Sequence, residues 1–300
     1  MKRRSFLKAA GICAGSGVLR FDPLFAFQDK LWKINMLTPE TGLFTERGGA
    51  ILFNISKEGI VVVDSQFPAQ AANFIAEMKN RTDKTYRLLI NTHHHPDHSG
   101  GNIAFKDVTK NVLAHENSKL NQQSNAKLKN TESQQLYPNQ TYATKWCEKI
   151  GGQTICLHYF GSGHTSGDSV VHFEKDNIAH MGDLCFNRIY PNIDASAGAS
   201  MKSWIDVLDK TYKLLDRKTK VICSHGNPVE NVIVDREFVK EQRLFFEKTF
   251  DFVEKEIKAG KSRDEIIANT AIPGNEQWKD EWKFAKVNLA MAFDESQKKN

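Results

Sequence analysis

The chain has 300 residues, of which 40% are hydrophobic and 26% charged, and its formal net charge is +5. This balance is typical of a globular protein with a substantial core, and no shift in composition divides the chain. Five Lys and Arg residues stand against Asp22 alone in the first 26 residues, so the rest of the chain is almost neutral. A near-neutral body provides no electrostatic basis for nucleic-acid binding, and we expect no nucleic-acid partner.

The first residues resemble an export signal. The run from Lys2 to Lys8 contains Arg3 and Arg4 and is similar to a twin-arginine signal, and the weakly apolar stretch after it is too short to span a bilayer. We therefore expect residues 1–26 to be a signal peptide read by the twin-arginine export machinery, with cleavage before Phe27. This predicts a periplasmic or exported protein without a stable membrane anchor. An amphipathic or disordered N-terminal arm is the alternative.

The first predicted strands form a hairpin. Residues 50–55 and 60–64 are apolar runs separated by Gly59, and the second run is continuously apolar, which indicates a strand buried on both faces. A helix is predicted from Pro68 and a short strand over residues 112–114. A polar helix follows to about Asn130, and the polar residues 121–139 indicate a solvated helix or a lid-like loop.

The stretch around His93 has the highest density of chemically active side chains. His93 and His95 follow an apolar run, and if the strand continues through them, both imidazoles project from the same face. Pro96 then ends the strand, and the bend carries Asp97 and His98 to a second point beside the first. One short loop can thus serve two adjacent cations; a run of surface histidines is the less specific interpretation.

The second half repeats the pattern of strands and helices. Residues 153–160 alternate as a strand does, residues 169–173 and 178–181 form a hairpin, residues 201–215 have helical spacing, and residues 221–223 are the last strand. From about residue 235, Phe238 to Ile257 predict a long amphipathic helix. Helices near residues 263–268 and 278–292 would complete the chain.

The motif at residues 93–98, His-x-His-x-Asp-His after a hydrophobic strand, resembles the signature of the metallo-β-lactamase superfamily. Three further matches follow in the order that the family requires. His164 lies in Gly-x-Gly-His-Thr, Asp183 follows Gly182, and His225 precedes a glycine. The resemblance covers residues 31 to 230. It implies a four-layer αββα sandwich of the α/β class over residues 27–300, with C-terminal helices from about 235 and metals at the open edge between the sheets.

The resemblance also implies a ligand set for two cations. One metal would have the ligands His93, His95 and His164, the other Asp97, His98 and His225, and Asp183 would bridge them. Imidazoles and carboxylates suit two Zn²⁺ ions, and they also suit Fe or Mn. A hydroxide bridging the metals would then attack the substrate, with Asp97 and Asp183 as the catalytic carboxylates.

Other residues receive different predictions. Asp64 is either a carboxylate behind the metal loop or a simple turn residue. Arg188 and Tyr190 could contact substrate, or belong to a surface loop. We expect the remaining histidines and the cysteines after the signal to be structural, with Cys185 facing the core and no disulfides: His94, His115, His158, His172, His180, Cys147, Cys156, Cys185 and Cys223.

The leading function is a dinuclear-metal hydrolase of a small-molecule ester, thioester, lactone or related bond. Asp183 favours the Asp-bridged, glyoxalase II-like branch over the antibiotic-hydrolysing branches. The alternatives are a mononuclear-iron oxidoreductase similar to persulfide dioxygenases, a β-lactam hydrolase, and a non-catalytic metal-binding or scaffold protein. The complete set of seven ligands favours the hydrolase with two metals. Substrate, native metal and oligomeric state are left open.

Overall fold

The N-terminal half forms a seven-stranded sheet. The computed structural model describes residues 31–228 and 231–298. The strands of this sheet, in spatial order, are β1 (Lys33–Met36), β2 (Thr41–Thr45), β3 (Ile51–Ser56), β4 (Gly59–Val63), β5 (Tyr86–Ile90), β6 (Val112–His115) and β7 (Gln140–Tyr142). The pairs from β1 to β4 are antiparallel and those from β4 to β7 are parallel. Parallel neighbours need crossovers, and helices supply two of them, α1 (Pro68–Arg81) and α3 (Glu116–Lys129).

A second sheet of six strands follows. Its spatial order is β15 (Ile233–Asp235), β13 (Lys220–Ile222), β11 (Ile178–His180), β10 (Val170–Phe173), β9 (Gln153–His158) and β8 (Lys145–Ile150). Both β9 and β11 pair antiparallel with β10, and β13 pairs parallel with β11, so β9, β11 and β13 run in one direction. The loops that follow these three strands therefore leave the sheet at the same end of the strands. The segments that follow β11 and β13 form a further short parallel pair, β12 (Phe186–Asn187) with β14 (His225–Gly226).

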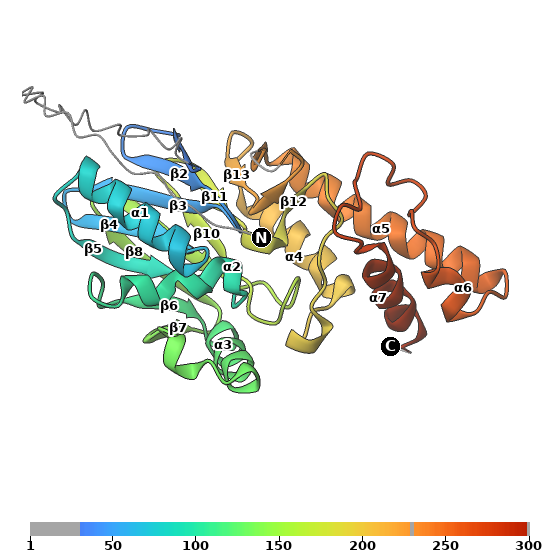
Figure 1. The fold of residues 1–300 in the computed structure, drawn as a ribbon. Coiled ribbons are helices and arrows are strands. Elements are labelled where there is room, and N and C mark those ends of the chain that lie inside the picture. Colours follow the sequence, from blue (N-terminus) through green and yellow to red (C-terminus); the bar gives the residue numbers. More distant parts are fainter. Residues whose placement is uncertain (1–30, 229–230, 299–300) are drawn as a thin grey trace, which may run out of the picture. The chain divides into compact units, whose positions relative to one another are not determined.

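The helices cover the outer faces of the two sheets. The remaining helices are α2 (Pro96–Ser99), α4 (Met201–Leu214), α5 (Glu237–Lys258), α6 (Arg263–Ile267) and α7 (Ala285–Gln297). In Figure 1, α1 crosses the outer face of the first sheet, and α4, α5 and α7 gather on the side of the second. Each layer boundary has its own apolar core: Phe53 and Phe74 between α1 and the first sheet, Leu88 and Leu157 between the sheets, and Val221 and Trp204 between the second sheet and its helices. The predicted αββα sandwich is confirmed.

Several sequence-based boundaries were incomplete. The short strands β1, β2, β7, β8 and β15 were not predicted. Three of them, β1, β7 and β15, have at most four residues and are mostly exposed or half-buried, whereas β2 is almost wholly buried and β8 alternates, so no single hydrophobic pattern marks them. The last helix begins at Ala285 rather than Trp278. Lys283 has a φ of 60°, which breaks a helix, and the Asp280 carboxylate accepts hydrogen bonds from the first free amides, those of Phe284 and Ala285.

The expectation that no disulfide forms is wrong. Cys147 on β8 and Cys156 on β9 are directly opposite in the antiparallel register and are joined by a disulfide. Their separation in sequence matches no disulfide framework, so only the strand register reveals the pairing. Cys185 and Cys223 are buried free thiols, as expected of core residues.

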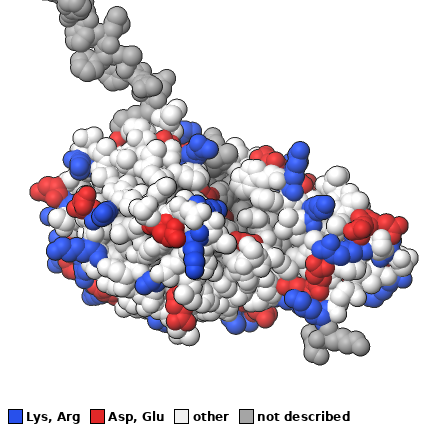
Figure 2. All heavy atoms as spheres, turned by 60° about the horizontal axis from the view of Figure 1, so that its bottom comes forward, with Lys and Arg blue, Asp and Glu red and all other residues white. Residues whose placement is uncertain are grey.

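The described residues from Trp32 onward form one compact unit. None of the helices described in residues 31–228 and 231–298 combines the length and apolarity needed to cross a membrane. On the face drawn in Figure 2, Lys and Arg alternate with Asp and Glu, and neither sign dominates. The predicted signal peptide, residues 1–26, lies outside the described residues.

Candidate metal centre

The histidine-rich loop starts where β5 ends. The strand stops at Ile90 instead of continuing through His93, so residues 91–95 form a loop. Pro96 is the first residue of α2, and it keeps His95 extended, with φ −64° and ψ 149°. The Asp64 carboxylate, at the end of β4, accepts hydrogen bonds from the backbone amide and the hydroxyl of Thr92. The loop is therefore held by a buried carboxylate from the neighbouring strand.

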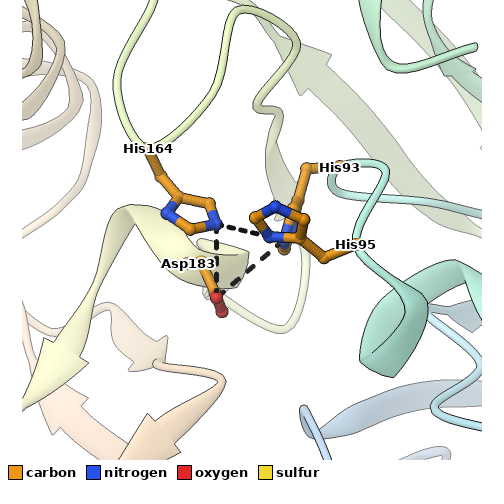
Figure 3. Close-up of side chains that lie close together, drawn as sticks. All are labelled: His93, His95, His164 and Asp183. Carbon is orange, nitrogen blue, oxygen red and sulfur yellow. Dashed lines mark hydrogen bonds and ion pairs between the residues drawn. The ribbon is translucent and has the colours of Figure 1, made fainter. Parts of the chain in front are cut away.

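Three imidazoles converge on one point (Figure 3). His95 Nδ1 lies 3.1 Å from His93 Nε2 and 2.8 Å from His164 Nε2. His164 comes from the loop after β9. The nitrogen on the far side of each ring faces an oxygen: His93 Nδ1 faces Thr92 Oγ1, His95 Nε2 faces the Asp194 carboxylate, and His164 Nδ1 faces the carbonyl of Asn192. Because the Thr92 hydroxyl already donates to Asp64, it can accept from His93.

These outer partners determine the tautomers. An acceptor oxygen lies beside the outer nitrogen of each ring, so the proton of each neutral imidazole is assigned to that nitrogen. The inner nitrogen of each ring then presents a lone pair. The lone pair of His95 then lies about 3 Å from those of His93 and His164, and such lone pairs repel unless a cation lies between them. The local geometry therefore fits a metal ion.

Asp183 connects this group to a second one. It lies in a short 3-10 helix after β11, and its Oδ2 is 3.4 Å from His164 Nε2. Its Oδ1 is directed the other way, 3.1 Å from His98 Nε2 and 3.3 Å from His225 Nε2. The preceding Gly182 has a φ of 53°, and a Cβ there would lie 2.5 Å from Thr92 Oγ1. Glycine is thus required for the tight approach of this turn to the histidine loop.

The second group consists of Asp97, His98 and His225. His225 Nε2 lies 3.2 Å from Asp97 Oδ2, and His98 Nε2 lies 3.5 Å from the same atom. His98 Nδ1 donates to Asp64 at 2.8 Å, so Nε2 is the ring nitrogen that faces Asp183 and is available to a cation. The structure thus brings all seven predicted ligands together, in the two groups His93, His95, His164 and Asp183, and Asp97, His98 and His225.

Charge and burial at this centre fit a divalent cation. His98 Nε2 and Asp183 Oδ1 are buried and lack a conventional hydrogen-bond partner among the described residues. Burial by itself would raise the pKa of Asp183, yet the charges of His225 and His98 hold it well below its usual range. Burial would lower the pKa of His225, but Asp183 and Asp97 raise it to about 9. A divalent cation would replace the proton on His225 and balance the charge of the Asp183 carboxylate, so these nitrogen and carboxylate donors suit a divalent metal.

Two carboxylates at the site had no role in the sequence-based prediction. Asp194 Oδ2 accepts from His95 Nε2 at 2.9 Å and fixes that ring. Asp168 is buried, accepts hydrogen bonds from the amide and hydroxyl of Thr165, and has its pKa raised to about 7, chiefly by burial. Asp168 belongs to the motif around His164 and could have been found there. Asp194 lies in no motif, so nothing in the sequence indicated it.

The predicted substrate contacts are wrong. Tyr190 is buried, its hydroxyl accepts from the amide of Ile272, and its ring packs on Phe245. Arg188 pairs with Glu241 and lies over the ring of Phe238. Neither side chain lines the cleft in front of the donors. Their position soon after Asp183 in sequence suggested proximity, but the chain turns back into the core.

Among the histidines outside the seven donors, His115 and His180 bond the backbone as structural residues do, and a structural role for His94, His158 and His172 stays a prediction. His115 bonds the carbonyl of Ala143, and His180 bonds the carbonyl of Ala50. Burial lowers the pKa of His158 to about 4 and that of His172 below its usual range. His94 is buried, with a pKa that burial lowers to about 3, and it lies 3.8 Å from Asp194. Cys185 packs in the core, its Sγ 2.9 Å from that of Cys223.

A cleft of about 510 Å³ opens in front of the donors. It exposes parts of four donors, His95, Asp97, Asp183 and His225. The other lining residues are Arg47, Gly48, Phe67, Pro96, Phe186, Asn192, Trp282 and Phe284. A small substrate can thus reach both groups of donors from one side.

Comparison with known proteins agrees with this geometry. Residues 48–226 match the family model described as the metallo-beta-lactamase superfamily. The chain belongs to the metallo-β-lactamase superfamily. The match covers all seven donors, and it ends before the C-terminal segment that contributes Trp282 and Phe284 to the cleft.

Relatives within the superfamily carry different names. A metallo-beta-lactamase type 2 from Elizabethkingia meningoseptica is 24% identical over 61% of this chain and 71% of its own length. A hydroxyacylglutathione hydrolase from Thermosynechococcus vestitus is 27% identical over 57% of this chain, which spans 60% of that relative. Among solved structures, a metallo-beta-lactamase from Pontibacter korlensis has a TM-score of 0.60 at 22% identity, covering 70% of this chain and 95% of its own. A double mutant of the sec-alkyl sulfatase PisA1 has a TM-score of 0.69 at 15% identity, and the match covers 88% of this chain and 50% of the sulfatase chain. These structures share the fold.

Proposed function

We propose that the protein is a metal-dependent hydrolase that cleaves an ester, thioester, lactone or related bond. The observation that carries this proposal is the Asp183 carboxylate, which directs one oxygen to each group of donors. His93, His95 and His164 would hold one cation, Asp97, His98 and His225 the other, and Asp183 would bridge them. The donor types favour two Zn²⁺ ions, and Fe or Mn also fit.

The donor residues and the carboxylates behind them have different roles in the proposed reaction. Divalent cations held by these residues would polarise the scissile bond and lower the pKa of water toward neutrality. Among the donor carboxylates, Asp97 is the more open to the cleft, with a side chain 24% exposed against 6% for Asp183. It can accept a proton from the attacking water and return it to the leaving group. Asp64 and Asp194 hold His98 and His95 in the tautomers that binding requires.

Two branches of the superfamily offer candidates for the reaction. The hydroxyacylglutathione hydrolases among the relatives, together with the carboxylate at Asp183, support a thioester hydrolase of the glyoxalase II-like, Asp-bridged branch. Relatives named metallo-beta-lactamase support β-lactam hydrolysis as the second candidate. The thioester or ester hydrolase is preferred because Asp183 leaves less room at the bridge for a bulky ring.

The test is elemental analysis together with a substrate panel. We expect two divalent cations per chain and turnover of thioesters, esters or lactones that is lost in Asp183→Asn. Asp206→Asn, which removes an exposed carboxylate on α4, is the matched control and should keep full activity. One tightly bound iron per chain, or an active Asp183→Asn variant, would contradict the proposal. Turnover of a chromogenic cephalosporin alone would favour the second candidate.

Export is part of the proposal. The disulfide between Cys147 and Cys156 supports an oxidising compartment, independently of residues 1–26. We expect the mature domain to start at Phe27 in the periplasmic fraction, as measured by mass spectrometry. Replacing Arg3 and Arg4 by Lys should retain the full-length chain in the cytoplasm. Unchanged export of that double variant would refute the twin-arginine route.

A further inference from the structure

The segment between α6 and α7 forms one wall of the cleft. It is fixed to the loop after Asp183, because the amide of Lys279 donates to the carbonyl of Arg188 at 2.8 Å and its carbonyl accepts from the amide of Tyr190 at 2.9 Å. The Tyr190 hydroxyl also accepts from the amide of Ile272. This wall is therefore built into the fold, although it lies outside the region that the family model matches.

Trp282 contributes an exposed aromatic ring to this wall. Its ring meets His225 edge to face, at a centroid distance of 5.2 Å and an angle of 89°, and packs on Phe284 at 5.8 Å. Phe186 stacks on His225 at 5.7 Å. Phe186 is fully buried, but Trp282 is 43% exposed. A large aromatic face is thus uncovered directly beside a donor of the candidate metal centre, where an apolar group of a ligand would bury it.

Arg47 lies at the other end of the donors. It precedes Gly48, at which a Cβ would lie 2.9 Å from the Asp97 Cβ, so this turn packs directly on the donor loop. The guanidinium lies 5.6 Å from the ring centre of Phe67. Within residues 31–228 and 231–298, Arg47 is the one Lys or Arg that lines the cleft, and no carboxylate lies within 4.0 Å of it. An anion from solution can therefore pair with it.

The donors separate these two features. Gly48 contacts Asp97, Asp97 lies 3.2 Å from His225, and His225 contacts Trp282. A ligand that reaches from Arg47 to Trp282 must cross the donor pair of Asp97 and His225. The cleft therefore selects a molecule with an anionic end, an apolar end and the reactive bond between them.

We propose that the substrate is a monoanionic ester or thioester with an aryl or similarly large apolar group, which lies against Trp282 while its anionic group pairs with Arg47. This inference rests on the proposed hydrolase function and names its substrate class. Arg47 supplies one positive charge away from the donors, which matches one anionic group on the substrate. Trp282 and Arg47 are specificity residues, and neither is a donor of the metal centre.

Binding can be measured without turnover. We would titrate the metal-loaded protein by calorimetry with two non-hydrolysable ethers, 4-(4-nitrophenoxy)butanoate and the neutral 4-(4-nitrophenoxy)butanamide. The butanoate should bind about fivefold more tightly, which is about 1 kcal/mol and within the range of an exposed ion pair. Arg47→Gln should abolish this preference and leave the affinity for the amide unchanged. Trp282→Ala should weaken both ligands about tenfold.

One control variant and two further measurements separate local from general effects. Lys57→Gln removes the same charge from an exposed turn at the other end of β3, roughly 20 Å away, and should keep the fivefold preference. The nitroaryl group should quench tryptophan fluorescence in the original protein, and Trp282→Ala should lose most of that quenching. Circular dichroism would verify that the variants fold.

The outcomes distinguish this inference from the proposed function. Equal affinity for the acid and the amide, or an acid preference that survives Arg47→Gln, would overturn the inference because the carboxylate would then bind at the metals. Measuring turnover provides a second test. The kcat/KM for mono-4-nitrophenyl glutarate should be higher than that for 4-nitrophenyl pentanoate, and this difference should disappear when Arg47 is replaced. If both ethers bind as described but no ester or thioester is cleaved, the hydrolase function fails and the binding site stands.

Discussion

The Asp64 carboxylate provides the sharpest test of the metal centre. It is fully buried and accepts three hydrogen bonds, from the Thr92 amide at 2.7 Å, the Thr92 hydroxyl at 2.8 Å and His98 Nδ1 at 2.8 Å. Its φ is 64°, a conformation that Asn also tolerates. Asp64→Asn therefore changes the hydrogen bonding of His98 without adding backbone strain.

The variant should lose metal affinity and a limited amount of stability. An amide nitrogen placed at the former Oδ2 would donate to His98 Nδ1, which moves the His98 proton to Nε2, where the cation must bind. We expect metal affinity at the group of Asp97, His98 and His225 to fall about 10- to 100-fold. The metal-free protein should lose only about 1–3 kcal/mol, because the Thr92 amide keeps an acceptor and the His98 proton then faces Asp183.

Chelator competition with elemental analysis would measure the affinity, and urea unfolding of the metal-free protein would measure the stability. Asp206→Asn is the control for loss of one carboxylate. If Asp64→Asn binds two cations as tightly as the original protein, Asp64 does not set the tautomer of His98 and the reasoning is refuted.

Three further outcomes are expected. Removing metal with a chelator should lower Tm, and restoring free metal at about 100 times its Kd should recover about 2.7 kcal/mol in the free energy of unfolding. A Tm that does not change when metal is removed or added would contradict the metal site. Trp204→Ala should cost about 3–5 kcal/mol in urea unfolding, because this fully buried ring packs on Phe246 at 4.7 Å and its indole donates to the carbonyl of Leu184; a loss below about 1 kcal/mol would mean that the core is not packed as described. Replacing Cys147 and Cys156 together by Ala should cost about 2–3 kcal/mol, the value for a short closed loop, and an unchanged denaturation midpoint would show that the cross-link is absent in solution.

The cluster at residues 93–98 was predictable from local sequence, whereas His164, Asp183 and His225 were assigned through the family resemblance. Four donors lie within six residues of one loop, and the other three each follow a strand with a glycine next to them. The periodicity of apolar residues also predicted the strands that precede these donors. The layer architecture was predicted through family resemblance rather than from periodicity alone.

What holds and surrounds the donors was decided only by the tertiary structure. Asp194 reaches His95 across 99 residues, the disulfide depends on strand register, and Trp282 and Arg47 face one cleft from opposite ends of the chain. Arg188 and Tyr190 show the reverse, since they follow Asp183 closely in sequence and yet turn into the core. Short spacings specify which side chains share a loop, because a few backbone angles set their positions. Contacts between distant segments depend on how whole layers pack, and no local pattern in the sequence encodes that.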